Sequence, residues 1–291
     1  MLTAGPVNSE GEILCHVQDG LARVQLSNPR KHNAMSRHMW LQLRTVFERI
    51  QANPSVRCVL MTGAACGKHQ AFSAGGDISE YPSFRFNETS LREFHEVDVW
   101  GGLQAMLNCD APIVAQIDGA CMGAGIEMAS CCDIRIASNT AQFGAPIAKL
   151  GFPMAPKEAQ LVANAVGTLT AKEMLLEAAV LDAPTLLVRG FLNRVVDAAQ
   201  LSESAMQSVH RILALAPQAA RFNKQTFRRI YMENTAVDGV LIAYSAINNI
   251  ANEDPDSAKA YAYANSAEHR EGIQAFIDKR PPNWPNPSSR T

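Results

Sequence analysis

The chain lacks the charge pattern and the long apolar runs that mark nucleic-acid-binding and membrane proteins. Its 291 residues include 26 lysines and arginines against 28 aspartates and glutamates, a formal net charge of −2. Such a balance provides no basic field to attract nucleic acid. No apolar run is long enough to span a bilayer, because Asp118, Glu127 and Asp133 interrupt the most apolar region. The first residues, MLTAGPVNSEGE, lack the apolar core of a signal peptide. We therefore expect a cytoplasmic protein without nucleic-acid or membrane partners.

The sequence also lacks the spaced motifs of disulfide, metal and dinucleotide sites. Its seven cysteines are an odd number and include no C-x-x-C pair, which indicates free thiols in a reducing cytosol. No H-E-x-x-H or similar cluster suggests a metal. Gly123 and Gly125 begin a G-x-G-x-x-G, but Met128 occupies the third glycine position, so the dinucleotide fingerprint fails. We expect no metal and no separate cofactor.

What the chain does contain is a pattern of strands and helices that predicts the α/β class. Apolar residues make up 47% of the chain and charged residues 19%, as in compact globular proteins. Helical patterns, such as the one that Ser36 can cap, alternate with apolar strand-like runs. These runs cover residues 12–17, 21–26, 56–61, 113–117 and 133–137. From about Ala198 to Arg280 the apolar spacing is helical, so we expect an α/β core over 1–197 and a helical module over 198–291.

The most informative stretch runs from Ile113 to Leu150. An apolar strand leads into small residues at 119–125, and Glu127 follows among apolar neighbours. The first N–H groups of a helix have no partner inside it and carry the positive end of its dipole. Such a helix start can hold an anion, or an oxygen that becomes one during a reaction. Because the segment has almost no other polar residue, we expect Glu127 to be buried; the alternative is a surface helix with Glu127 on its wet face.

Two further segments carry candidate residues. Residues 71–75 read A-F-S-A-G and nearly spell the nucleophile elbow G-x-S-x-G. Ala71 breaks that pattern, so we do not expect Ser73 to be a nucleophile. Residues 82–100 are rich in aromatic side chains and contain His95. They fit either a mobile cover over a pocket or an ordinary surface helix.

Six motifs along the chain together resemble the crotonase superfamily, which includes the enoyl-CoA hydratases and isomerases. They are Asn28-Pro29 with Asn33-Ala34, Ala71 to Ile78, Gly119 to Asp133, Gln142-Phe143-Gly144, Gly190 to Val196 and Glu271 to Arg280. The resemblance implies a crotonase-like spiral of ββα units with a helical C-terminal trimerisation module, and self-assembly as trimers or dimers of trimers. It also implies an acyl-CoA thioester substrate, of which coenzyme A is a part, as in fatty acid metabolism.

The resemblance carries over to particular residues. The backbone N–H groups of Gly76 and Ala124 would hold the thioester carbonyl in an oxyanion hole, and Glu127 would be the acid/base. The positions implied for contacts with the acyl-CoA are Lys31, Ala74, Asp77, Ile78, Ile147, Phe276 and Lys279. Of these, Lys31 is a candidate phosphate contact, and Phe276 and Lys279 would reach the CoA of a neighbouring subunit.

One position departs from the hydratase pattern. A second carboxylate is expected after Gln142-Phe143-Gly144-x-Pro, but Ile147 stands there. An aliphatic side chain cannot transfer a proton, and each positioned acid or base contributes roughly 10²–10⁴ in rate. We therefore expect double-bond isomerisation in preference to hydration.

Other readings remain open at this stage. A hydratase would need a different second acid. The candidates are His95, Asp98 and Glu158, although Lys157 suggests that Glu158 begins a surface helix. The further alternatives are a CoA thioester hydrolase or decarboxylase, and a non-catalytic acyl-CoA-binding scaffold, because one fold supports many reactions.

Overall fold

The structure is a computed structural model that describes residues 11–67, 70–235 and 266–284. Contacts within the chain divide it into two compact units, Met1–Leu213 and Ala214–Thr291. Each unit is described by itself. The sequence-based boundary after residue 197 stays a prediction.

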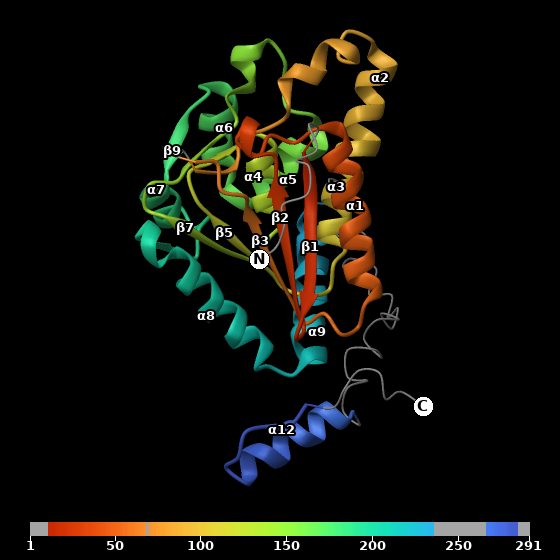
Figure 1. The fold of residues 1–291 in the computed structure, drawn as a ribbon, viewed down its shortest axis with the longest axis vertical. Coiled ribbons are helices and arrows are strands. Elements are labelled where there is room, and N and C mark those ends of the chain that lie inside the picture. The colour runs from red at the N-terminus through yellow and green to blue at the C-terminus, as the bar shows by residue number, and fades with distance from the viewer. Residues whose placement is uncertain (1–10, 68–69, 236–265, 285–291) are drawn as a thin grey trace, which may run out of the picture. The chain divides into compact units, whose positions relative to one another are not determined.

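The first unit contains a six-stranded sheet (Figure 1). Its order is β1 (Glu12–Gln18), β2 (Leu21–Ser27), β3 (Cys58–Gly63), β5 (Ile113–Ile117), β7 (Ile134–Ser138) and β10 (Arg194–Val196). Only the β1–β2 pair is antiparallel, and the other neighbours are parallel. Asp19 and Gly20 join β1 to β2 with φ of 50° and 80°, as a tight hairpin turn requires.

A second sheet positions the loops that matter for function. It is four-stranded, in the order β4 (Ala71–Ser73), β6 (Ala120–Met122), β8 (Gln142–Gly144) and β9 (Val180–Asp182). In three successive steps the chain leaves a strand of the large sheet and enters one of the small sheet, from β3 to β4, from β5 to β6 and from β7 to β8. Since β4, β6 and β8 are parallel, the segments that follow them emerge at the same edge.

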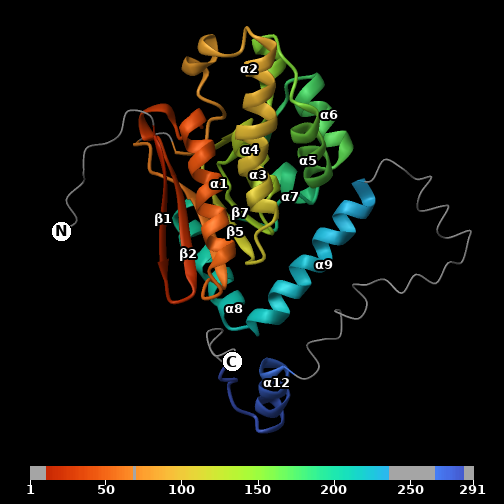
Figure 2. The same ribbon diagram turned by 90° about the vertical axis from the view of Figure 1, so that its right-hand side faces the viewer.

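Helices cover both sheets of the first unit. They are α1 (Arg37–Ala52), α2 (Glu88–Glu93), α3 (Trp100–Leu107), α4 (Ala124–Ser130), α5 (Pro156–Val166), α6 (Thr168–Leu176), α7 (Ala183–Val188) and α8 (Leu201–Leu213). As predicted, Ser36 caps α1 by accepting a hydrogen bond from the Met39 N–H. Helices α1 and α3 run side by side (Figure 2). A 3₁₀ helix (Ile78–Ser83) and a π-helix (Phe94–Val99) lie between β4 and α3.

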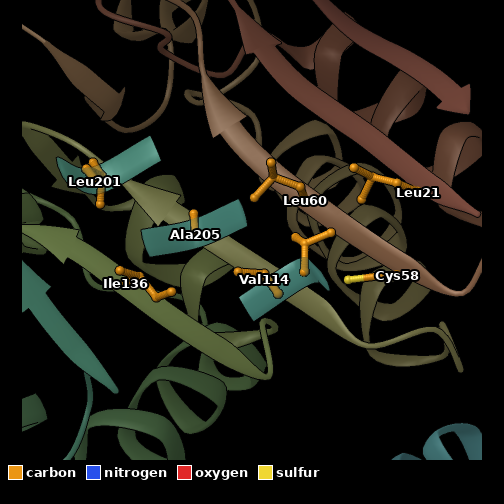
Figure 3. Close-up of a cluster of buried hydrophobic side chains, with 8 residues drawn as sticks. Leu21, Cys58, Leu60, Val114, Ile136, Leu201 and Ala205 are labelled. Carbon is orange, nitrogen blue, oxygen red and sulfur yellow. The ribbon is translucent and has the colours of Figure 1, made fainter. Parts of the chain in front are cut away.

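Helix α8 packs against the large sheet. Its side chains Leu201, Ala205 and Val209 are buried against the sheet. The sheet contributes Leu21, Cys58, Leu60, Val114 and Ile136 to the same cluster (Figure 3). Burial of the leucine, isoleucine and valine side chains of this cluster stabilises the fold by roughly 1.5–3 kcal/mol each. Five of the seven free cysteines are buried, so most of them are small core residues.

The second unit is helical in its described part. Helix α9 covers Pro217–Thr235 and α12 covers Ala267–Ile277. The Gln218 N–H donates to the buried Glu268 carboxylate at 2.8 Å, and the Trp284 indole donates to the Ala214 carbonyl at 2.9 Å. Much of the stretch predicted to be helical, residues 236–265, lies outside the described residues. No helix in the described parts of the chain is long and apolar enough to cross a membrane.

The corner between β5 and β6 leads to a stability prediction. Gly119 has φ of 63°, and a Cβ there would overlap the Gln70 carbonyl oxygen. Gly119→Ala should therefore cost about 1–2 kcal/mol for left-handed backbone and a further ~1–3 kcal/mol for overpacking. Gly167→Ala is the matched control, since Gly167 has φ of 84° but a Cβ there would meet no atom within 4 Å. Urea unfolding should give Gly119→Ala the clearly lower midpoint; equal midpoints would contradict this account.

Candidate active site

Two glycine-containing loops pack backbone against backbone where β4 and β6 end. The loop after β4 is fixed to Met35, whose N–H donates to the Gly75 carbonyl and whose carbonyl accepts from the Asp77 N–H, both at 2.8 Å. Gly123 has φ of 47°, and a Cβ there would lie 3.7 Å from the Gly75 Cα. A Cβ on Gly125 would lie only 2.8 Å from a carbonyl oxygen of β4. Glycine is therefore needed for this approach.

The two loops leave two backbone N–H groups without an acceptor. Within the described residues, neither Gly76 nor Ala124 donates its N–H to another protein atom. The Ala124 group is the first of α4, so no carbonyl of that helix can accept it. Both residues line one cavity. A pair of free donors at one cavity wall suits an oxygen atom that gains negative charge.

The cavity is small and mixes carboxyl groups with aromatic walls. Its volume is about 50 Å³, enough for one or two water molecules. Four predicted site residues line it: Gly76, Ala124, Glu127 and Ile147. The remaining lining residues are Trp40, Tyr81, Arg85, Phe94, His95, Val99, Gly123, Phe152, Pro153, Met154 and Glu158.

Glu127 is buried, so the wet-face alternative is wrong. Its exposed fraction is 6%, and its neighbours Ile126 and Met128 are fully buried. Burial raises the pKa of the Glu127 carboxyl well above its ordinary value. The nearby Glu158 carboxyl adds to this rise, and His95 opposes it. A carboxyl whose pKa is raised in this way is better matched to acid–base chemistry near neutral pH than an exposed one.

Glu158 is also buried, so the prediction that it begins a surface helix is wrong. Its exposed fraction is 3%. The residue before it, Lys157, does lie at the surface and pairs with Glu96. Adjacent residues on a helix point in different directions, so the polarity of Lys157 was a poor guide. Burial raises the pKa of the Glu158 carboxyl to about 8, and its oxygen lies 2.8 Å from the His95 Nδ1.

Part of the segment 82–100 folds inward over the cavity, so it is not an ordinary surface helix. Phe84 and Phe94 are buried, with ring centroids 4.5 Å apart. The Arg85 guanidinium lies 4.5 Å from the centroid of the Tyr81 ring and 3.7 Å from that of Phe152. Neither Tyr81 nor Arg85 was identified from the sequence, because no motif marks them.

The other predicted residues lie outside the cavity. Asp98 pairs with Arg37 and does not line it. Ala74 and Ile78 are exposed on the same loop as Gly76. Phe276 is exposed in the second unit, and Lys279 lies there too, just after α12.

Lys31 and Asp77 form an ion pair. The Lys31 Nζ lies 2.6 Å from the Asp77 carboxylate and 2.8 Å from the Ser79 hydroxyl. Partial burial would raise the pKa of Asp77, but the hydrogen bonds from Lys31 and Ser79 outweigh it and lower that pKa. Contacts of Lys31 and Asp77 with a substrate stay predictions.

Comparisons with known proteins agree with the predicted fold class. The family model for enoyl-CoA hydratase/isomerase matches residues 16–287. A probable enoyl-CoA hydratase of Mycobacterium leprae is 29% identical over 91% of this chain and 96% of its own length. A short-chain-enoyl-CoA hydratase of Clostridium acetobutylicum is 29% identical over 75% of this chain and 81% of its own.

Solved structures agree as well. The crystal structure of an enoyl-CoA hydratase/carnithine racemase from Magnetospirillum magneticum superimposes with a TM-score of 0.83 and 30% identity. It covers 97% of this chain and 96% of the other. The predicted crotonase-like α/β fold is thus confirmed.

The buried carboxyls predict how stability depends on pH. Burial and Arg85 lower the pKa of His95, so in the folded chain this ring is neutral above pH 6.5. From there toward pH 8 the folded chain keeps on Glu158, whose pKa burial raises to about 8, a proton that the unfolded chain has released. The free energy of unfolding should therefore fall as pH rises, by up to about 1.4 kcal/mol per pH unit for one carboxyl.

Glu158→Gln should flatten this fall, whereas Glu173→Gln, at a surface pair with Arg189, should leave it unchanged. Urea unfolding at pH 6.5, 7.25 and 8 measures both slopes. Equal slopes for wild type and Glu158→Gln would show that Glu158 is ionised in the folded protein throughout.

Proposed function

Because the chain belongs to the enoyl-CoA hydratase/isomerase family of the crotonase superfamily, we propose that it transfers protons on an acyl-CoA thioester through an enolate. Enzymes of this family are of the lyase or isomerase type. The observation that carries the proposal is one cavity in which a buried carboxyl, Glu127, stands beside the free N–H groups of Gly76 and Ala124.

The two N–H groups are the proposed oxyanion hole. When a proton leaves the α-carbon of a thioester, negative charge develops on the carbonyl oxygen. Fixed donors that meet this charge need no rearrangement during the reaction, and each contributes on the order of 10²–10³ in rate. Because Gly76 and Ala124 offer backbone donors, the alanine side chain at 124 does not weaken the hole.

Glu127 is the proposed acid/base. It lies one turn after Ala124 on α4, and on this account its carboxyl serves the α-carbon of the bound acyl group. Burial brings its pKa up toward the working pH, where an acid/base is most effective. With Ile147 at the position of a second acid, we propose double-bond isomerisation as the reaction.

The proposal also covers the contacts with CoA, the assembly of the chain and its location. The acyl-CoA is bound along Lys31, Ala74, Asp77 and Ile78, with no separate cofactor. A second copy of the chain would bring Phe276 and Lys279 to that CoA in a trimer or dimer of trimers. Cytoplasmic location and the absence of nucleic-acid and membrane partners also stay predictions.

Exchange in deuterated water tests the role of Glu127. Wild-type protein should incorporate deuterium into a 3-enoyl-CoA and convert it to the 2-enoyl isomer without a gain of water. Glu127→Gln keeps the shape but cannot accept the proton, so exchange should fall about 10²–10⁴-fold. Glu48→Gln, at a surface pair with Arg44, is the control.

Mass spectrometry of the product separates the alternatives. Undiminished exchange in Glu127→Gln would overturn the proposal. Release of free CoA would indicate a thioester hydrolase, and release of carbon dioxide a decarboxylase. Binding of CoA thioesters without exchange would indicate a scaffold.

Lys31 gives a separate prediction about substrate binding. If its ammonium contacts a phosphate of CoA, Lys31→Met should raise the KM for an acyl-CoA about 10- to 100-fold, as expected for a hydrogen bond to a charged group. The KM for the matching acyl-pantetheine, which has no phosphate, should not change. This comparison removes any effect of leaving Asp77 unpaired. Lys172→Met, on exposed α6 surface, is the control, and equal increases for both substrates would argue against a phosphate contact.

A further inference from the structure

The cavity holds a second carboxyl that the proposed reaction does not yet use. Glu158 comes from α5, whereas Glu127 comes from α4, and both are at least nine-tenths buried. Placing two carboxyls in one cavity of about 50 Å³ costs stability through desolvation and mutual repulsion. Such an arrangement is typical of sites where both groups take part in chemistry.

The Glu158 carboxyl is held in a fixed position. Its helix begins with Pro156 at the first position, which places Glu158 where a glutamate can accept the N–H of the capping residue Ala155. From the other side, the His95 Nδ1 lies 2.8 Å from its Oε1.

The contact beyond His95 decides which nitrogen of the ring carries its proton. The Arg85 Nη1 lies 3.5 Å from the His95 Nε2. Arginine can only donate hydrogen bonds, so Nε2 is the acceptor and the ring proton lies on Nδ1. His95 therefore donates to Glu158, which makes it suited to orient that carboxyl and to support its ionised form.

The two carboxyls approach the substrate space from different elements. Glu127 shares α4 with the donor of Ala124, so it serves the carbon next to the thioester. Glu158 comes from α5, which does not carry that donor, and it lines the cavity together with His95, Arg85 and Tyr81. With the carbon next to the thioester assigned to Glu127, we assign to Glu158 a carbon farther along the acyl chain.

We propose that Glu158, oriented by His95, is a second catalytic acid/base of this site and delivers a proton to the γ-carbon of the acyl group. The inference rests on the proposed function, since it needs the enolate that Glu127 and the oxyanion donors create. Glu158 would thus supply, from α5, an acid that position 147 lacks. His95 is a positioning residue.

The step balances without any further reactant. The Glu127 carboxylate takes a proton from the α-carbon of a 3-enoyl thioester, and the electrons of that C–H bond form the enolate. As the enolate collapses to the C2–C3 double bond, the electron pair of the C3–C4 double bond takes the proton of the Glu158 carboxyl. Glu127 is then protonated and Glu158 ionised, and proton exchange with solvent restores both. The raised pKa of Glu158, about 8 because of burial, keeps its proton available at neutral pH.

A purely structural role at the start of α5 is the competing explanation, and Glu158→Gln separates the two. Glutamine keeps the capping hydrogen bond but cannot deliver a proton. In deuterated water with a 3-enoyl-CoA, wild-type protein should place deuterium on the γ-carbon at each turnover. Glu158→Gln should retain deuterium exchange at the α-carbon within about threefold of wild type, while isomerisation falls about 10²–10⁴-fold. Glu127→Gln should lose both.

Each outcome points to a different conclusion. Isomerisation by Glu158→Gln at the wild-type rate overturns the inference and leaves the proposed function standing. Retained α-exchange in Glu127→Gln, or no exchange in wild type, overturns the proposed function and the inference with it. If wild type adds water to a 2-enoyl-CoA and Glu158→Gln does not, Glu158 is an acid/base of a hydratase. That result overturns isomerisation and the delivery of a proton to the γ-carbon.

His95 has its own test in the pH dependence. The charged and titratable groups that face Glu158 come from three places. They are Glu127 on α4, Tyr81, and Arg85, His95 and Glu96 in the segment 82–100. Activity that needs protonated Glu158 should decline as pH rises through about 8. His95→Ala removes a donor to the ionised form, so the decline should move to higher pH and the rate should fall about tenfold. His95→Asn, which keeps a donor near the Nδ1 position, should restore the decline near pH 8. An unshifted profile in His95→Ala would overturn the positioning role.

Discussion

The close approach of two backbone segments is the constraint on which the rest of the site depends. The loop after β4 and the start of α4 touch through glycines, and any side chain at these positions would strike a neighbouring carbonyl or force a left-handed backbone. The small sheet makes this approach possible, because its parallel strands deliver successive loops to one edge. The free N–H groups of Gly76 and Ala124 are a direct result, since each belongs to a segment whose neighbours already use the available acceptors.

Burial of two carboxyls beside these donors works against the stability of the fold. The large sheet and α8 form a dense apolar core that stabilises the fold. Because the net free energy of unfolding of a protein is small, this core has to offset the free-energy cost of burying the two carboxyls. The arrangement of partners reduces that cost, because His95 hydrogen-bonds Glu158 and the positive charge of Arg85 favours the ionised form of Glu158. Proton affinity in the cavity is therefore set jointly by residues from α4, α5 and the segment between β4 and α3.

Much of the fold could be predicted from sequence because its signals are local. The turn at Asp19-Gly20, the cap at Ser36 and the apolar run of β5 each lie within a few residues, and the structure has all of them. Burial of Glu127 followed from the lack of polar neighbours. The inward direction of Glu158 could not be predicted in this way, because it depends on packing against residues 82–100, which are far away in sequence. The same holds for Tyr81 and Arg85, which contact the distant Phe152 ring, Tyr81 edge to face and Arg85 over its face.

Tyr81 has a consequence for how tightly any acyl group is held. Its hydroxyl lies so close to Gly76 that a side chain there would collide with it, and its ring helps to reduce the cavity to about 50 Å³. An acyl group larger than this cavity needs lining residues to move, and Tyr81 is one of them. Apparent affinity then equals the affinity of the open form multiplied by the fraction of molecules that are open. Loss of the ring contacts among Tyr81, Phe84 and Phe152 would raise this fraction, so tighter binding could arise without a single new contact to the ligand.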